Sequence, residues 1–300
     1  MSLDEITAMP ILTIHHKTEY RYARPVSFGE HRVMLRPRDG YDLRVTGEAL
    51  IIEPMPIATR WIRDLFGNTV GTVKFAGQSD KLLFDSMVKV EHRPVRGLHL
   101  SPEDYAYLHP FAYDDDEMPD LALSIKREYD DADRRIELWA RQFVSRSGHT
   151  RTQDLLADIT HAIKRDFVYR RRSEPGVQSP LQTLRTGEGT CRDFAVFMME
   201  AVRSLGYAAR FVSGYLHVRG SDNDRVGGGS THAWVQVYLP SAGWVEFDPT
   251  NGIVGNSDLI RVAVARAPRQ AIPIWGSFTG NLSDHLAMNV SIKVVSEAGA

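Results

Sequence analysis

The sequence predicts an α+β protein in which an N-terminal antiparallel β-sandwich precedes a core where a helix packs on an antiparallel sheet. The first hundred residues indicate the sandwich, because their hydrophobic residues recur with a period of two. The period becomes helical from about residue 132. After residue 190 one amphipathic helix is followed by several short strands, an order typical of α+β folds.

The clearest strand covers residues 11–22. Leu12 and Ile14 have even numbers there, while polar residues such as Lys17 and Glu19 have odd numbers, so the two sets lie on opposite faces of a strand. The same reasoning predicts further short strands at 32–37, 43–53, 57–64, 69–75 and 81–91. Several short strands in succession, with no good helix among them, indicate an antiparallel sandwich.

These patterns divide the chain into four segments. Residues 1–100 form the sandwich, and residues 101–131, rich in proline and acidic residues, form a linker or a segment that wraps the core. Residues 132–270 form the core. Residues 271–300 form a C-terminal extension that ends in a strand at 288–296, where apolar and polar residues alternate.

Within the core, helical spacing predicts three helices. The first contains Ile136, Leu138, Trp139 and Phe143, and the second begins at Thr152 and continues to Phe167. The third covers 191–205 and ends before Gly206. The strands expected to follow it are 208–217, 232–239 and 244–248.

Composition excludes several classes of function. The chain has 36 basic and 38 acidic residues and a formal net charge of −2, so nucleic acid is not an expected partner. No signal peptide and no long apolar run is found, so no membrane association is expected and the predicted location is the cytoplasm. The single cysteine excludes an intramolecular disulfide and any multi-thiolate metal site.

That cysteine, Cys191, follows a Gly-Glu-Gly-Thr turn and opens the third helix. Thr190 suits the N-cap position, and Asp193 completes a capping box. A thiol in the first turn of a helix lies at the positive end of the helix dipole, which favours the thiolate that a nucleophile requires. The alternative is a buried structural cysteine.

Two other residues could complete a catalytic triad. His232 begins a strand after Gly227-Gly228-Gly229 and could exchange a proton with the thiol, while Asp248 ends the next strand and could hold the imidazole. The alternative for Asp248 is a simple Asp-Pro turn. In an antiparallel hairpin the numbers of two paired residues always add up to the same total. The two residues lie on one face of the sheet only if that total is even. A four-residue loop would separate them, so we expect either a tighter turn around Pro240 or a bulge.

Three blocks, GTCRDFA at 189–195, THAWVQVYLP at 231–240 and GWVEFDPTNG at 243–252, together resemble the transglutaminase-like superfamily in its bacterial branch. The stretches HHKTEYRYARPV and LFGNTV are similar to the β-rich domain that precedes this core in bacterial members. The resemblance implies a papain-like core, with Cys191 as the nucleophile, His232 as the general base and acid, and Asp248 as the residue that orients the imidazole.

The resemblance also implies attack on an amide or ester carbonyl through a thioester, with a peptide, protein or other amide as the substrate. Water or an amine could accept the acyl group, and hydrolysis is the default. A non-catalytic peptide-binding or scaffold module on the same fold is the alternative. No metal or cofactor is expected. Neither the oligomeric state nor the second oxyanion donor follows from the sequence, since no spacing argument assigns Gln182.

The glycine-rich loop at 219–230 leads directly into His232 and should border the site. It contains little apolar surface to hold it in place. Two interpretations stay open, a flap that closes over the acyl chain and a plain connector.

Overall fold

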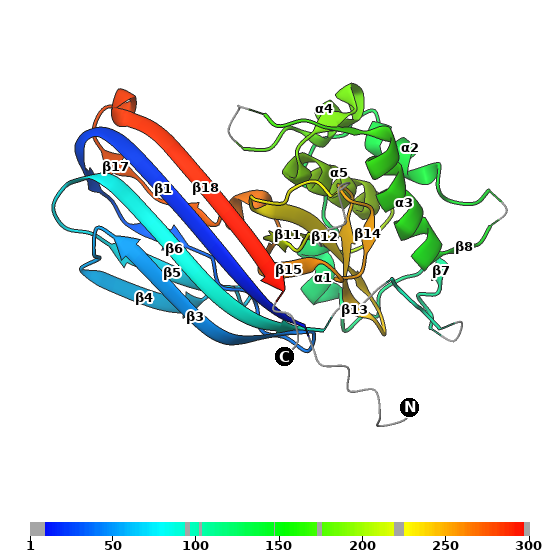
Figure 1. Cartoon of the computed structure of the whole chain (residues 1–300). Helices are drawn as coiled ribbons and strands as arrows, with labels where there is room; N and C mark the ends of the chain where they lie inside the picture. Colours follow the sequence, from blue (N-terminus) through cyan, green and yellow to red (C-terminus); the bar gives the residue numbers. More distant parts are fainter. Residues whose placement is uncertain are drawn as a thin grey trace.

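The computed structural model describes residues 10–296 except 94–96, 102–103, 147, 173–175 and 219–224. The N-terminal part is a sandwich of two antiparallel sheets (Figure 1). One sheet contains β1 (Ile11–Phe28), β6 (Ser79–His92) and β3 (Leu43–Glu53), and the other contains β2 (His31–Val33), β5 (Thr69–Lys74) and β4 (Ala58–Arg63). Apolar residues from both sheets, including Phe28, Val33 and Phe84, fill the space between them.

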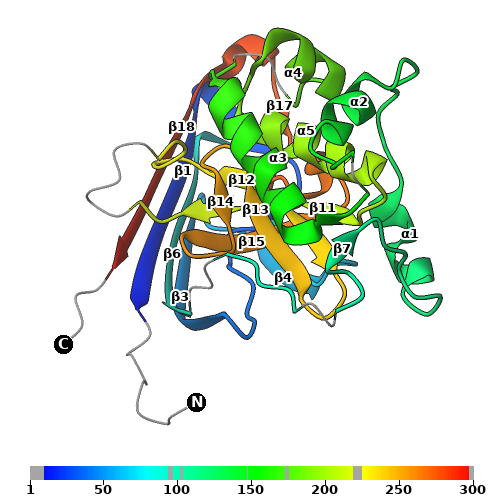
Figure 2. The same cartoon turned by 90° about the vertical axis from the view of Figure 1, so that its right-hand side faces the viewer.

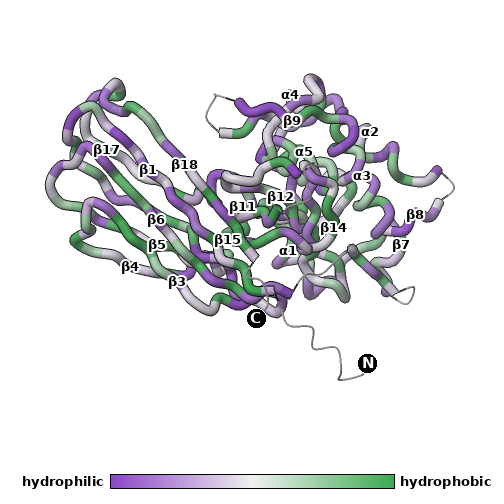
Figure 3. Tube along the Cα trace, viewed as in Figure 1, coloured by the Kyte–Doolittle hydropathy of each residue, from purple (hydrophilic) through white to green (hydrophobic). Residues whose placement is uncertain are grey.

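The alternation predicted for residues 11–22 is confirmed, and the strand itself continues to Phe28 beyond an irregular, exposed stretch at 23–25. Leu12, Ile14 and His16 are buried on one face of β1, and Figure 3 shows hydrophilic and hydrophobic residues alternating along these strands. The strand predicted at 32–37 is shorter than expected, because ladder pairing includes only His31–Val33.

The end of the chain joins the same sandwich. β18 (His285–Ser296) runs antiparallel to β1, from Leu12 opposite Ser296 to Tyr22 opposite His285. Figure 2 shows the two strands side by side. β17 (Phe278–Thr279) also pairs with β1, and β16 (Ile274–Trp275) pairs with β2. The strand predicted at 288–296 is therefore present, and strands from both ends of the chain share one sheet.

The segment between the sandwich and the core contains structure that the sequence reasoning missed. β7 (Leu108–His109) pairs with β8 (Thr150–Arg151), and α1 (Met118–Ile125) occupies part of the expected linker. This helix has Pro119 in its first turn, and Leu121 is its one buried residue. So short a helix with one buried side chain carries too weak a periodicity to recognise in a sequence.

The core consists of one antiparallel sheet with helices on the side away from the sandwich (Figure 1). The sheet has the order β14 (Ile253–Val254), β13 (Gly243–Asp248), β12 (His232–Leu239), β11 (Ala209–Leu216) and β15 (Leu259–Ala265). The helices are α2 (Arg135–Arg141), α3 (Thr152–Asp166), α4 (Pro180–Thr186) and α5 (Cys191–Ser204). A two-stranded parallel sheet joins β9 (Val168–Tyr169) to β10 (Glu188–Gly189). Short 3₁₀ helices cover Pro268–Gln270 and Leu282–Asp284.

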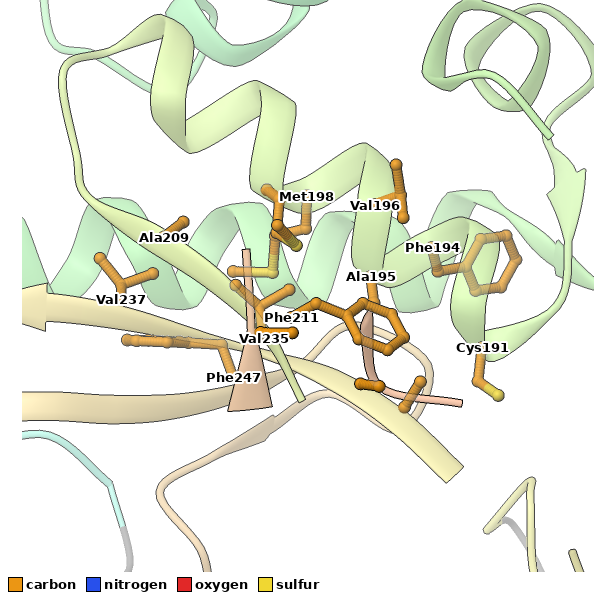
Figure 4. Packing of buried hydrophobic residues seen from close by; sticks show 14 of the residues in the cluster. Cys191, Phe194, Ala195, Val196, Met198, Ala209, Phe211, Val235, Val237 and Phe247 are labelled. Atoms are coloured by element: carbon orange, nitrogen blue, oxygen red, sulfur yellow. The ribbon is translucent and has the colours of Figure 1, made fainter. Parts of the chain in front are cut away.

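Helix α5 forms the centre of the hydrophobic core. Its apolar residues pack on β11 and β12, where Phe211 and Val235 are buried (Figure 4). The predicted α+β fold, with a cysteine-bearing helix packed on an antiparallel sheet, is confirmed. Gly206, with φ of 94°, follows the helix as predicted.

Sandwich and core are joined by buried polar contacts. The Asn68 side chain donates to the carbonyl of Val264 at 2.7 Å and accepts from its N–H at 2.9 Å. His16 Nδ1 lies 2.9 Å from the hydroxyl of Tyr215 in β11. Because the two parts share one hydrophobic cluster as well, the sandwich forms a fixed wall beside the core.

Candidate active site

The N-terminus of α5 is held by the predicted capping box. The Thr190 hydroxyl accepts from the N–H of Asp193 at 3.4 Å, and the Asp193 carboxylate accepts from the N–H of Thr190 at 2.8 Å. Asp193 also accepts from Arg172 and from the N–H of Gln178. These bonds fix the turn that carries Cys191, whose sulfur points away from the packed residues in Figure 4.

The register of the β12–β13 hairpin places His232 and Asp248 on one face. Val235 pairs with Phe247 and Leu239 pairs with Gly243, so the numbers of paired residues have an even total. The loop between the strands has three residues, and Ser241 within it has φ of 69°. The tighter turn, the first of the two predicted solutions, is therefore confirmed.

His232 and Asp248 form a buried pair. His232 Nε2 lies 2.8 Å from Asp248 Oδ2, and both side chains are fully buried. Nδ1, the other ring nitrogen, is buried and has no hydrogen-bond partner among the described residues, and the nearby Cys191 contributes to raising the pKa of His232. Sequence analysis predicted this grouping of the three residues, and the structure brings them together.

The electrostatics of the group favour a thiolate and an imidazolium. Burial lowers the pKa of His232, but Asp248 and Cys191 outweigh burial and raise it to about 10. Burial raises the pKa of the Cys191 thiol, while His232 and then Arg192 bring it below its ordinary value. Burial raises the pKa of Asp248 as well, but His232 and Asn251 hold it low. A proton can therefore pass from the sulfur to the imidazole near neutral pH.

Asn251 is a site residue that sequence reasoning missed. Its side chain donates to Asp248 Oδ2 at 2.8 Å and also lies 3.4 Å from His232 Nε2. It bonds both backbone groups of Val226 as well, at 2.8 and 3.1 Å. The signal was available, because Asn251 follows Asp248 by three residues within the quoted block.

The described part of the glycine-rich loop borders the site as predicted. Gly227 has φ of 105°, and a Cβ added there would lie 2.6 Å from His232 Nδ1. The N–H of Ile292 in β18 donates to Gly229 at 3.2 Å. Residues 219–224 of this loop lie outside the described residues, and the two interpretations of the loop stay predictions.

Gln182 does not reach the site. Its side-chain oxygen accepts from Arg185 at 2.5 Å in an exposed pair on α4. Tyr169 lies closer, because it pairs with Gly189 two residues before Cys191. Burial raises the pKa of Tyr169, and the neighbouring Cys191 raises it further. Sequence analysis gave no signal for Tyr169.

Two further features of the described residues concern possible metal ligands and the length of the helices. Among them, no group of three or more His, Cys, Asp or Glu could hold an ion. None of the helices in the described ranges has the length and hydropathy of a bilayer-spanning segment.

The fold and the site define the class of this protein: an α+β protein in which a cysteine at the start of a helix lies near a histidine and an aspartate from two neighbouring strands. Residues 137–249 match the model of the transglutaminase-like superfamily, and residues 12–91 match that of the bacterial transglutaminase-like N-terminal region. The chain belongs to the transglutaminase-like superfamily, as the three sequence blocks indicated.

The similarity to known proteins covers both the sandwich and the core. Uncharacterized protein Rv2569c of Mycobacterium tuberculosis is 30% identical over 98% of this chain and 97% of its own length. YebA of Bacillus subtilis is 26% identical over 73% of this chain but only 28% of its own length. The crystal structure of a "putative cysteine protease" from Cytophaga hutchinsonii has a TM-score of 0.71 and 18% identity, covering 97% of this chain and 92% of that one. That likeness shows the shared fold.

Proposed function

We propose that this protein is a cysteine-dependent acyl-transfer enzyme that acts on amide bonds through a thioester, with hydrolysis as its default reaction. The observation that carries the proposal is His232, which is bonded to buried Asp248 through one ring nitrogen and interacts with Cys191. A histidine that is bonded to a carboxylate through one ring nitrogen and has a thiol nearby is the arrangement typical of nucleophilic catalysis by cysteine.

In the proposed mechanism the Cys191 thiolate attacks the carbonyl carbon of the amide. The oxyanion that forms accepts a hydrogen bond from the N–H of Cys191, because the first N–H groups of a helix have no partner within it. The Tyr169 hydroxyl is our candidate for the second donor, supported by its place opposite Gly189. His232 then gives its proton to the leaving amine, and the C–N bond breaks to leave the thioester.

Water completes the cycle. His232, now neutral, takes a proton from water as the water attacks the thioester carbonyl, and the proton returns to the sulfur as the C–S bond breaks. Asp248 stays ionised and stabilises the imidazolium, while Asn251 holds the carboxylate in place. An amine that entered in place of water would give transamidation.

The test is direct detection of the intermediate. The protein is incubated with a peptide and cell-wall-fragment library, and intact mass and peptide mapping locate any acyl adduct. We expect an adduct on Cys191 that is absent from Cys191→Ala. If no library member acylates Cys191 although the thiol is reactive, the non-catalytic binding module becomes the better account.

A further inference from the structure

A cavity of about 510 Å³ lies between the sandwich and the core. One wall comes from strands β1 and β18, through residues such as Thr18 and Val290. The other wall includes Arg192 and Thr231, the chain neighbours of Cys191 and His232. Because two of its lining residues adjoin the proposed catalytic residues in the chain, this cavity is the candidate space for the part of a substrate beyond the scissile amide.

The cavity combines apolar walls with positive charge. Val177, Ile272 and Met288 are among its apolar lining residues. The ionisable side chains on its wall are basic or neutral at pH 7. Arg192 and Arg269 are cations, while burial lowers the pKa of His16 to about 4. The described lining residues include no carboxylate, although acids slightly outnumber bases in the chain as a whole.

Arg192 is the cation with no counter-ion of its own. Its guanidinium lies 5.7 Å from the ring centroid of Phe211, and among the described residues no carboxylate forms an ion pair with it. The adjacent Asp193 is already engaged by Arg172 at 3.0 Å. Arg269 differs, because it is largely exposed and lies 3.5 Å from Glu128.

Burial lowers the pKa of Arg192, while the neighbouring Cys191 and Asp193 raise it. Neither neighbour is an anion for Arg192 alone, because Cys191 interacts with His232 and Asp193 is bonded to Arg172. A partly buried guanidinium without an ion pair is a suitable partner for the anion of a ligand, since leaving such a charge unpaired costs free energy.

We infer that the cavity binds an amide substrate with a carboxylate close to the scissile bond, and that the Arg192 guanidinium is the group that binds this carboxylate. This inference rests on the proposed function and specifies its substrate class. A planar guanidinium pairs with a carboxylate through two parallel hydrogen bonds, which fixes the orientation of the substrate as well as its affinity. The apolar walls accommodate the remaining aliphatic part of the substrate.

The experiment compares matched peptides that carry Glu or Gln beside each amide, all with blocked ends. A further set of Gln peptides has a free C-terminal carboxylate. This set shows whether the carboxylate that Arg192 binds belongs to an acidic side chain or to the end of a peptide chain. The rate of acyl-adduct formation on Cys191 is measured by mass spectrometry. We expect at least about tenfold faster acylation from one carboxylate-bearing set than from the neutral set.

Arg192→Gln should remove that preference, so that carboxylate-bearing and neutral peptides acylate this variant at similar rates. Arg185→Gln is the matched control, because it removes an exposed positive charge of α4 outside the cavity. Arg192→Lys should keep only part of the preference, since it retains charge without the planar fork. Circular dichroism and iodoacetamide labelling establish that each variant is folded with an accessible thiol.

A second readout does not depend on catalysis. Calorimetry with Cys191→Ala should show binding of the carboxylate peptides that is lost on adding Arg192→Gln. Equal acylation by charged and neutral peptides, unchanged by Arg192→Gln, would overturn the inference and leave the proposed function standing. Arg192-dependent binding without any acylation would support the inference and contradict the proposed function. Absence of both binding and acylation would overturn the two together.

Discussion

Two buried histidines, one in the sandwich and one in the core, differ in their charge. His92 ends β6 and is 2% exposed, and His232 begins β12 and is fully buried. Burial lowers the pKa of His92 to about 4 even though Asp42 is near. The pKa of His232 is raised to about 10, because Asp248 and Cys191 outweigh burial.

The partner of each carboxylate explains the difference. Asp42 forms an ion pair with Arg261 at 2.5 Å, so the charge of this carboxylate is already balanced. The positive charge of Arg261 also lowers the pKa of His92, because two cations repel each other. Among the described residues no arginine pairs with Asp248, which bonds His232 directly. Of these two histidines, the one whose carboxylate is not engaged by an arginine has the raised pKa, and it is the one that interacts with the thiol.

The largest expected effect comes from removing the histidine of the core. His232→Ala should reduce the rate of acyl-adduct formation at least about a thousandfold, because the thiol loses the group that takes its proton. His92→Gln is the matched change in the sandwich and should leave the rate within about threefold. Similar losses from both variants would mean that His232 acts through the fold and not through the thiol.

Asp248→Asn should be milder. The amide keeps the shape of the carboxylate but cannot stabilise the imidazolium, so we expect a loss of at least about tenfold that stays smaller than that of His232→Ala. The pH profile of the rate should also move, because the pKa of His232 falls without Asp248. An unchanged rate and profile would assign Asp248 to the Asp-Pro turn alone.

Gly227→Ala tests the packing around the imidazole. The added Cβ would lie 2.6 Å from His232 Nδ1, so the ring must shift, and kcat/KM should fall about tenfold. Gly229→Ala is the control, since its φ of 81° strains the backbone too but nothing lies within 4 Å of the added Cβ. Equal effects of the two substitutions would attribute the loss to the loop backbone.

The smallest effect concerns stability and pH. Because the pKa of His92 is lowered to about 4 in the folded protein, the unfolded chain binds more protons between about pH 6.5 and 4. The free energy of unfolding should therefore fall as the pH falls through this window, and His92→Gln should remove about 2 kcal/mol of that fall. Urea denaturation at both ends of the window measures it, and an unaltered pH dependence would contradict the neutral state of His92.

Sequence patterns predicted the fold class, most strands of the sandwich and the capping box of α5. Each of these depends on residues that are near in sequence or on a fixed period. The shared face of His232 and Asp248 was expected only because a catalytic triad requires it. Helix α1 was missed because Leu121 is its one buried residue. The cavity beside Arg192 could not be predicted, since one of its walls comes from β1 and β18, strands near opposite ends of the chain. The catalytic roles and the domain boundaries stay predictions.

The central claim is that His232 and its carboxylate keep Cys191 as a thiolate near neutral pH. The most direct measurement is the rate of iodoacetamide labelling of Cys191 from about pH 4 to 10, beside a free cysteine peptide. The account predicts that the protein labels at least about tenfold faster than the peptide at pH 6 and that His232→Ala removes this advantage. A labelling curve that follows one ionisation at the ordinary thiol pKa of about 8.5, unchanged by His232→Ala, would contradict it.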